Sequence, residues 1–108
     1  MKPASFELEA DTELVLAVAW YEERQPGRGD ALLQDIKTVM SRIVERPRFF
    51  PQLLNLPANA LSERLVVRRA ILPRFPFGLI FVELEQEIRI IALAHLKRAP
   101  NYWFSRIQ

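Results

Sequence analysis

The side chains best suited to proton transfer lie near the C-terminus of the 108-residue chain. His95 is the only histidine, and an imidazole gains or loses a proton near neutral pH, as a general acid or base must. Arg98 lies three residues further on and Tyr102 seven, so both can meet His95 if the segment after it folds back. The alternative is structural: a half-buried His95 that hydrogen-bonds the backbone and holds the C-terminal segment in place.

Arginine dominates the positive charge and is concentrated in the later part of the chain. Twelve of the fifteen basic residues are Arg, whose planar guanidinium binds phosphate or carboxylate through two parallel hydrogen bonds. Residues 1–35 carry three bases and eight acids, a net charge of −5, whereas residues 36–108 carry twelve and five, a net charge of +7. A basic region of this kind is compatible with a nucleic-acid target or an acidic protein partner. The alternative is a solvated, ion-paired surface.

Composition excludes several kinds of site. Without cysteine there is no disulfide or thiolate chemistry, and one histidine with carboxylates at irregular spacing gives no metal signature. The three glycines form no phosphate-binding loop. The N-terminus lacks the apolar core of a signal peptide, and the longest apolar run, residues 14–21, is too short to span a bilayer. We therefore expect one cytoplasmic domain over residues 1–108, with no metal, cofactor or membrane partner.

Two helices are predicted in the first half of the chain. Residues 4–9 alternate as a short strand does, and Asp11 or Thr12 can then cap a helix with Glu13 in its first turn. Gln25-Pro26-Gly27-Arg28-Gly29 ends that helix. Its expected core residues are Leu14, Ala17, Val18, Trp20 and Tyr21. A second helix, residues 30–46, carries a nearly complete apolar stripe and is ended by Pro47.

Three strands are predicted after a proline-rich segment at residues 47–62. They cover residues 64–72, 77–84 and 87–95. Strict alternation in the last strand places Ile88, Ile90, Ala92 and Ala94 on one face and Arg89, Ile91, Leu93 and His95 on the other. The order β-α-α-β-β-β predicts an α+β fold, with two helices packed on a small, mainly antiparallel, twisted sheet.

This order of elements resembles the RelE/ParE superfamily of bacterial toxins, and so do four local patterns. The patterns are Trp20-Tyr21-Glu22, Arg68-Arg69-x-x-Leu72, Phe75-Pro76-Phe77 and the closing His95-x-x-Arg98-x-Pro100-x-Tyr102-Trp103-x-x-Arg106. The resemblance covers residues 6–106. It implies a plasmid stabilisation toxin of a type II toxin–antitoxin pair, held inactive in a hetero-oligomer by a cognate antitoxin. We expect an acidic, partly disordered antitoxin that orders on the basic C-terminal surface, as a helix in a groove or an added strand.

The resemblance implies one of two targets. RelE-like members cut messenger RNA on the ribosome, whereas ParE-like members inhibit DNA gyrase and are not nucleases. Metal-independent RNA cleavage by the 2′-hydroxyl requires a base, an acid and positive charge at the phosphate. For an endoribonuclease the nearest matches are catalytic His95, Arg98 and Tyr102, with phosphate or target contacts from Arg68, Arg69, Arg74 and Arg106. Tyr102 and Trp103 stack on bases in that case, and otherwise form an aromatic plug over the sheet.

Two further observations bear on these alternatives. Arg68 and Arg69 are neighbours on one predicted strand and point to opposite faces, so at most one lines a given groove. RelE-like nucleases usually carry an arginine just inside the third strand, where Gly78 stands here; this disfavours the nuclease unless Arg69 or Arg74 reaches the same place. Three hypotheses stay open: an mRNA-cleaving toxin, a gyrase-inhibiting toxin and a degenerate toxin fold that serves only as an antitoxin-binding or regulatory module.

Overall fold

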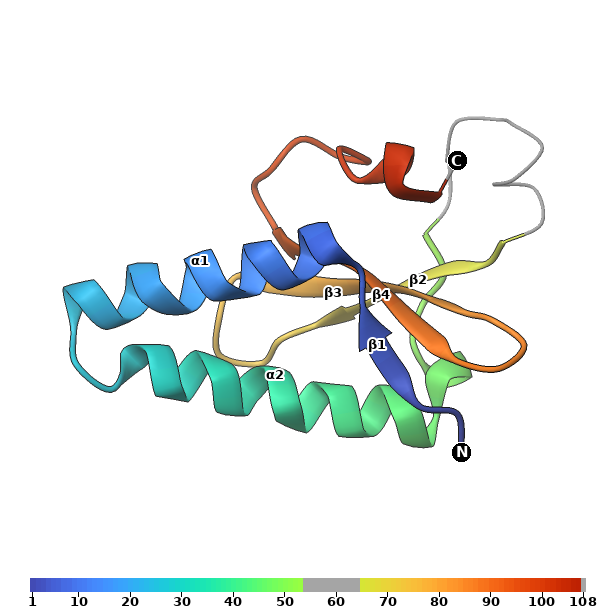
Figure 1. Cartoon of the computed structure of the whole chain (residues 1–108), viewed down its shortest axis with the longest axis horizontal. Coiled ribbons are helices and arrows are strands. Elements are labelled where there is room, and N and C mark those ends of the chain that lie inside the picture. Colours follow the sequence, from blue (N-terminus) through green and yellow to red (C-terminus); the bar gives the residue numbers. More distant parts are fainter. Residues whose placement is uncertain (54–64, 108) are drawn as a thin grey trace.

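The computed structural model describes residues 1–53 and 65–107, in which two helices pack on a four-stranded sheet (Figure 1). In chain order the elements are β1 (Ala4–Phe6), α1 (Leu8–Arg24), α2 (Arg28–Glu45), the 3-10 turn η1 (Pro47–Phe49), β2 (Val67–Ile71), β3 (Phe77–Glu83), β4 (Ile88–His95) and the 3-10 turn η2 (Phe104–Ile107). The predicted β-α-α-β-β-β order and α+β class are confirmed. Residue 64, where the second strand was predicted to begin, lies outside the described residues.

The strands lie in the order β1-β4-β3-β2. β1 runs parallel to β4, and the other two pairs are antiparallel, so the sheet is mainly antiparallel as predicted. β1 is short and pairs only with residues 88–90 of β4. The outer edge of β4 beyond residue 90 therefore has no strand beside it in the described chain.

A β-bulge in β4 reverses the predicted facing of its second half. Phe81 pairs with Ile90 and Ile80 pairs with Ala92, which leaves Ile91 without a partner on β3. The side chains after the bulge change faces: Leu93 packs on the helix side of the sheet, whereas Ala92 and Ala94 pack on the other. The predicted alternation is therefore correct only up to Ile91.

The first helix begins earlier than predicted. α1 starts at Leu8, and Glu7 occupies the N-cap without a side-chain hydrogen bond. Neither predicted capping residue caps the helix, since Asp11 lies in its first turn and the Thr12 hydroxyl donates to the Leu8 carbonyl within it (3.1 Å). Glu13 consequently lies beyond the first turn, where its carboxylate is available to other elements. Neither described helix is long and apolar enough to cross a membrane.

α2 follows the predicted apolar stripe and packs closely on α1. The buried side chains of the stripe are Leu32, Ile36, Val39 and Ile43. Gly27, with φ +94°, turns the chain between the helices, and the Glu22 carboxylate accepts the backbone N–H groups of Gly27 and Gly29 (3.0–3.1 Å). A Cβ at Gly29 would lie 2.8 Å from the Val18 carbonyl oxygen. Glycine is therefore required there by the close approach of the two helices.

The sheet has an apolar core on each face. The larger core lies between the sheet and the two helices. The smaller one is covered by the C-terminal segment, whose Trp103, Phe104 and Ile107 are buried. Figure 1 shows this segment, in red, turning back after β4. Trp103 thus acts as the aromatic plug considered from the sequence, and both faces of β4 are covered.

Glu83, the last residue of β3, ties the N-terminus and η1 to the sheet. Its carboxylate accepts a hydrogen bond from Lys2 Nζ (2.9 Å) and pairs with Arg48 (3.2 Å). The hydrogen bond from Lys2, opposed by desolvation and reinforced by Arg48, lowers the pKa of Glu83 below its ordinary value. A carboxylate with a lowered folded-state pKa contributes stability above its unfolded pKa, and the contribution is lost as pH falls through the folded-state pKa.

We therefore expect Glu83→Gln to lower the free energy of unfolding by about 0.5–1 kcal/mol near pH 7 and to have no effect near pH 2, where both forms are neutral. Urea denaturation at the two pH values measures this difference. Glu85→Gln is the matched control, because Glu85 is exposed two residues further on. A loss of equal size at both pH values would contradict the assignment.

Candidate functional site

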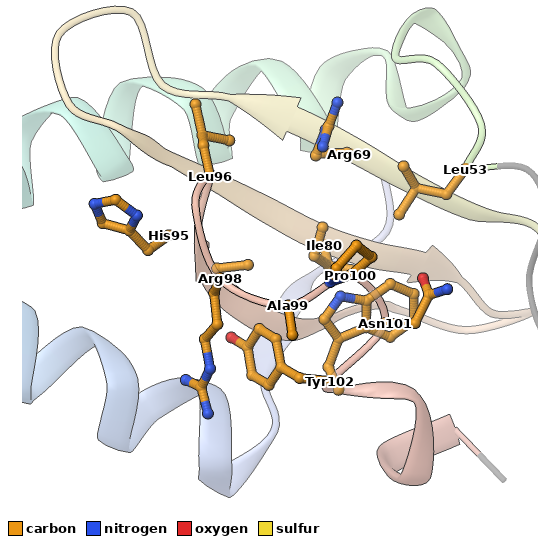
Figure 2. Close-up of a pocket in the computed structure, with 12 residues that line it drawn as sticks. Leu53, Arg69, Ile80, His95, Leu96, Arg98, Ala99, Pro100, Asn101 and Tyr102 are labelled. Carbon is orange, nitrogen blue, oxygen red and sulfur yellow. The ribbon is translucent and has the colours of Figure 1, made fainter.

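A cleft of about 350 Å³ lies between the C-terminal segment and the sheet face that this segment covers (Figure 2). Residues 94–103 form much of its lining, and Ile80 and Leu53 complete the apolar part. Four of the seven predicted site residues line this cleft: Arg69, His95, Arg98 and Tyr102. The arrangement brings two arginines, Arg69 and Arg98, and the aromatic residues Tyr102 and Trp103 to one hollow, which suits an anionic or planar ligand.

Arg69 lies across Gly78. A Cβ built at Gly78 would lie 3.0 Å from Cγ and 3.1 Å from Cδ of Arg69, so the aliphatic part of Arg69 crosses the space that a side chain at position 78 would need. Arg69 therefore lies directly beside the position at which the RelE/ParE resemblance led us to expect an arginine. Its Nε is buried and has no hydrogen-bond partner within residues 1–53 and 65–107. Unsatisfied buried donors of this kind are rare in folded proteins.

Arg68 and Arg74 do not line the cleft; each forms hydrogen bonds that stabilise a loop. Arg68 donates to the Phe50 carbonyl oxygen (2.7 Å) and faces away from Arg69, so the predicted opposite facing is confirmed. The Asp35 carboxylate, buried on α2, accepts both the backbone N–H and Nε of Arg74 (3.2 Å each). These contacts fix the segment before β2 and the β2–β3 loop, and Arg74 does not replace the missing side chain at Gly78.

One carboxylate on α1 gathers three of the predicted site residues. Glu13 accepts hydrogen bonds from the Tyr102 hydroxyl (2.5 Å), from Arg106 at both oxygens (2.9 and 3.1 Å) and from Arg98 (3.4 Å). The Arg98 guanidinium also stacks over the Tyr102 ring, 3.6 Å from its centroid. Glu13 was not among the predicted site residues, because an acid near the start of a helix is expected to interact with the helix dipole. The one signal in the sequence was the position of Glu13 directly before the apolar run at residues 14–21.

Tyr102 is a hydrogen-bond donor in this arrangement. Burial, the hydrogen bond to Glu13 and the charge of Glu13 raise the pKa of Tyr102 well above its ordinary value, and the charges of Arg98 and Arg106 offset this only in part. The hydrogen bond to Glu13 likewise raises the pKa of Arg106. The phenol is thus protonated at neutral pH, with its proton directed at a carboxylate.

His95 lies at the end of β4 and does not contact Tyr102. Its ring packs edge-on against Phe77 (5.2 Å between centroids), and its Nδ1 accepts the Lys97 backbone N–H (3.1 Å). Figure 2 shows the imidazole directed away from both Arg98 and Tyr102. The fold-back of the C-terminal segment brings Arg98 and Tyr102 together but leaves His95 apart from them.

An apolar groove of about 320 Å³ runs beside α1. Its lining residues are Leu16, Ala17, Trp20, Tyr21, Phe77 and His95. The prediction that Trp20 lies in the core is wrong, because its side chain is 50% exposed and carries the Arg24 guanidinium 3.5 Å above its ring. The apolar run at residues 14–21 gives α1 two apolar faces, one against the core and one toward solvent.

Comparison with known proteins identifies the fold. No family model matches the sequence, and no curated protein matches it. A chain of the solved structure described as "Chromosomal ParDE TA system from P. aeruginosa" is similar, with a TM-score of 0.61 and 22% identity over 90% of this chain and 98% of that chain. The chain therefore has the RelE/ParE-like fold that its sequence predicts. Within the described residues, no group of three or more His, Asp or Glu side chains could hold a metal ion.

Proposed function

We propose that the protein is the toxin of a type II toxin–antitoxin pair and that it inhibits growth by binding DNA gyrase. The observation that carries this proposal is the likeness to a chain of a ParDE toxin–antitoxin system over nearly the full length of both chains. A ParE-like toxin is expected to act as an inhibitor of gyrase and not as a nuclease. Because one fold supports several activities, the choice of target depends on the site.

The geometry of the candidate catalytic groups supports binding over RNA cleavage. Cleavage requires a base and an acid within reach of one phosphate. The Tyr102 hydroxyl instead donates to Glu13, and His95 is directed away from Tyr102. The cleft and the C-terminal segment offer Arg69 and Arg98 as cations to an acidic surface of the target.

The partner antitoxin covers the apolar groove on α1 in this proposal, in place of the basic C-terminal surface that the sequence suggested. Leu16 and Trp20 lie exposed on one face of the helix, and exposed apolar patches of this kind mark protein interfaces. Arg24 stacks on Trp20, and Arg28 lies 4.5 Å over the Phe75 ring, near the same end of the helix. These cations complement an acidic, amphipathic antitoxin segment.

A metal-independent endoribonuclease is the second candidate, and the position of Arg69 favours it. Arg69 and Arg98 both line the cleft, so a phosphate there would meet the positive charge of two guanidinium groups. Rotation of His95 toward the cleft would be needed to place a base there.

Inducible expression in bacteria, followed by examination of transcripts and plasmid topology, tests the proposal. We expect growth arrest with intact messages and altered supercoiling. Cleaved messages with normal supercoiling would instead support the nuclease, and Arg69→Ala would then lower cleavage by about 100-fold while Arg42→Ala, on the exposed face of α2, would not. Unimpaired growth at every expression level would indicate the degenerate module.

A further inference from the structure

We propose that Glu13 is a positioning residue that holds the C-terminal segment, residues 96–107, against the edge of β4 and so fixes Arg98 and Tyr102 beside the cleft. The inference rests on the proposed function only in taking this segment as part of the surface that contacts the target. The Glu13 carboxylate contacts both the edge of β4 and the side chains of the segment.

Glu13 and Arg106 complete the edge of β4 where β1 ends. The last contact from the β1 side is the Glu7 backbone N–H, which donates to the Ile90 carbonyl oxygen (2.9 Å). Beyond it, Glu13 accepts the Leu93 backbone N–H (3.1 Å) and Arg106 donates to the Ile91 carbonyl oxygen (2.9 Å). Two side chains thus make the hydrogen bonds that a neighbouring strand would otherwise make.

The two side chains are also paired with each other in a partly buried place. Arg106 contacts both oxygens of Glu13, and their side chains are only 13% and 15% exposed. Two parallel bonds between guanidinium and carboxylate set direction as well as distance. The end of the chain is therefore held at a defined position on β4.

The same carboxylate also fixes the part of the segment that directly follows β4. Oε2 of Glu13 accepts the Tyr102 hydroxyl and a bond from Arg98, and Arg98 in turn stacks on the Tyr102 ring. All of the side-chain and backbone groups that contact Glu13 are donors. An amide in place of the carboxylate would turn an NH₂ group toward one of those donors and remove the charge that pairs with Arg106.

The segment also has an apolar attachment that is independent of Glu13. Trp103, Phe104 and Ile107 are buried against the second core. Loss of the carboxylate is therefore expected to loosen the segment without unfolding the protein. An effect on the position of the segment can then be distinguished from an effect on folding.

Amide hydrogen exchange of the full chain tests the hold directly. In Glu13→Gln we expect exchange at Leu93 to be at least 10-fold faster, and exchange at Arg98 and Arg106 to be faster, with Leu79 unchanged. Tyr102→Phe removes only the hydroxyl contact and should leave Leu93 protected. Glu23→Gln, an exposed acid of the same helix, is the control and should match the wild type. Unchanged exchange at Leu93 in Glu13→Gln would overturn the proposal.

Inhibition of purified gyrase tests the functional part. Glu13→Gln is expected to raise the half-inhibitory concentration at least 10-fold, with a lower thermal midpoint because Arg106 loses its partly buried partner, but with the protein folded at the assay temperature. Glu13→Asp, which keeps the charge, is expected to recover part of the loss of inhibition. Faster exchange with unchanged inhibition would overturn the role in target contact. If the wild type does not inhibit gyrase, the proposed target is wrong, while the exchange result still decides whether Glu13 holds the segment.

Discussion

Replacing Phe81 by alanine is expected to lower the free energy of unfolding by about 3–5 kcal/mol. Phe81 is fully buried at the centre of β3, between β2 and β4. Its ring packs edge-to-face with Phe50, 5.9 Å between centroids, so the substitution removes an aromatic contact and leaves a cavity between the sheet and the helices. Domains of this size are stable by about 5–15 kcal/mol, so the substitution removes a large part of the total stability.

Urea denaturation followed by the fluorescence of the buried Trp103 measures this loss. Leu8→Ala is the control, because Leu8 is exposed at the start of α1, and exposed substitutions change stability by less than about 0.5 kcal/mol. A loss below about 1.5 kcal/mol at Phe81 would show that the surrounding side chains collapse into the space.

Local patterns predicted most of the elements because their causes are local. The stripe that includes Leu32, Ile36 and Val39 repeats with the helical period and is buried as expected. Proline and glycine ended the helices where the backbone could not continue, as at Gly27. The apolar runs at residues 77–84 and 87–95 predicted β3 and β4 to within one residue at each end.

The β-bulge and the exposed face of α1 were not predictable in the same way. Ile91 is one of several consecutive apolar residues, and nothing in its type marks it as the residue without a partner on β3. Its position depends on how the two strands pair, which is a tertiary property. Trp20 was placed in the core because large apolar side chains usually are, but α1 has more apolar side chains than the core can cover.

The sequence singled out several of the residues that line the cleft, but it did not predict the contacts among them. Arg98, Tyr102 and Arg106 do lie together, yet the group that joins them is Glu13, more than eighty residues earlier in the chain. Contacts at that sequence separation depend on the path of the segment after β4. Local patterns therefore identified side chains with suitable chemical groups. Only the fold showed that these side chains donate hydrogen bonds to a carboxylate far away in the sequence.

Placing aspartate at both Leu16 and Trp20 is expected to weaken binding of the antitoxin by about 100-fold or more. Both side chains are exposed and line the apolar groove on α1. A carboxylate at either position would be buried without a partner beneath the apolar face of the antitoxin segment. Two carboxylates would also repel the acidic residues of that segment. The folded protein should tolerate the change, because neither side chain belongs to the core.

Titration of the purified variant with the proposed antitoxin, to be sought as a small acidic protein encoded next to this chain, measures the loss. Phe49→Asp is the control: Phe49 is a large, exposed apolar residue, but it lies on η1, away from α1. In cells the double variant should still arrest growth, while co-expression of the antitoxin no longer restores it. Equal affinity of the double variant and the wild type would show that the antitoxin binds another face. A loss shared with Phe49→Asp would show that exposed apolar area in general, and not this groove, determines the affinity.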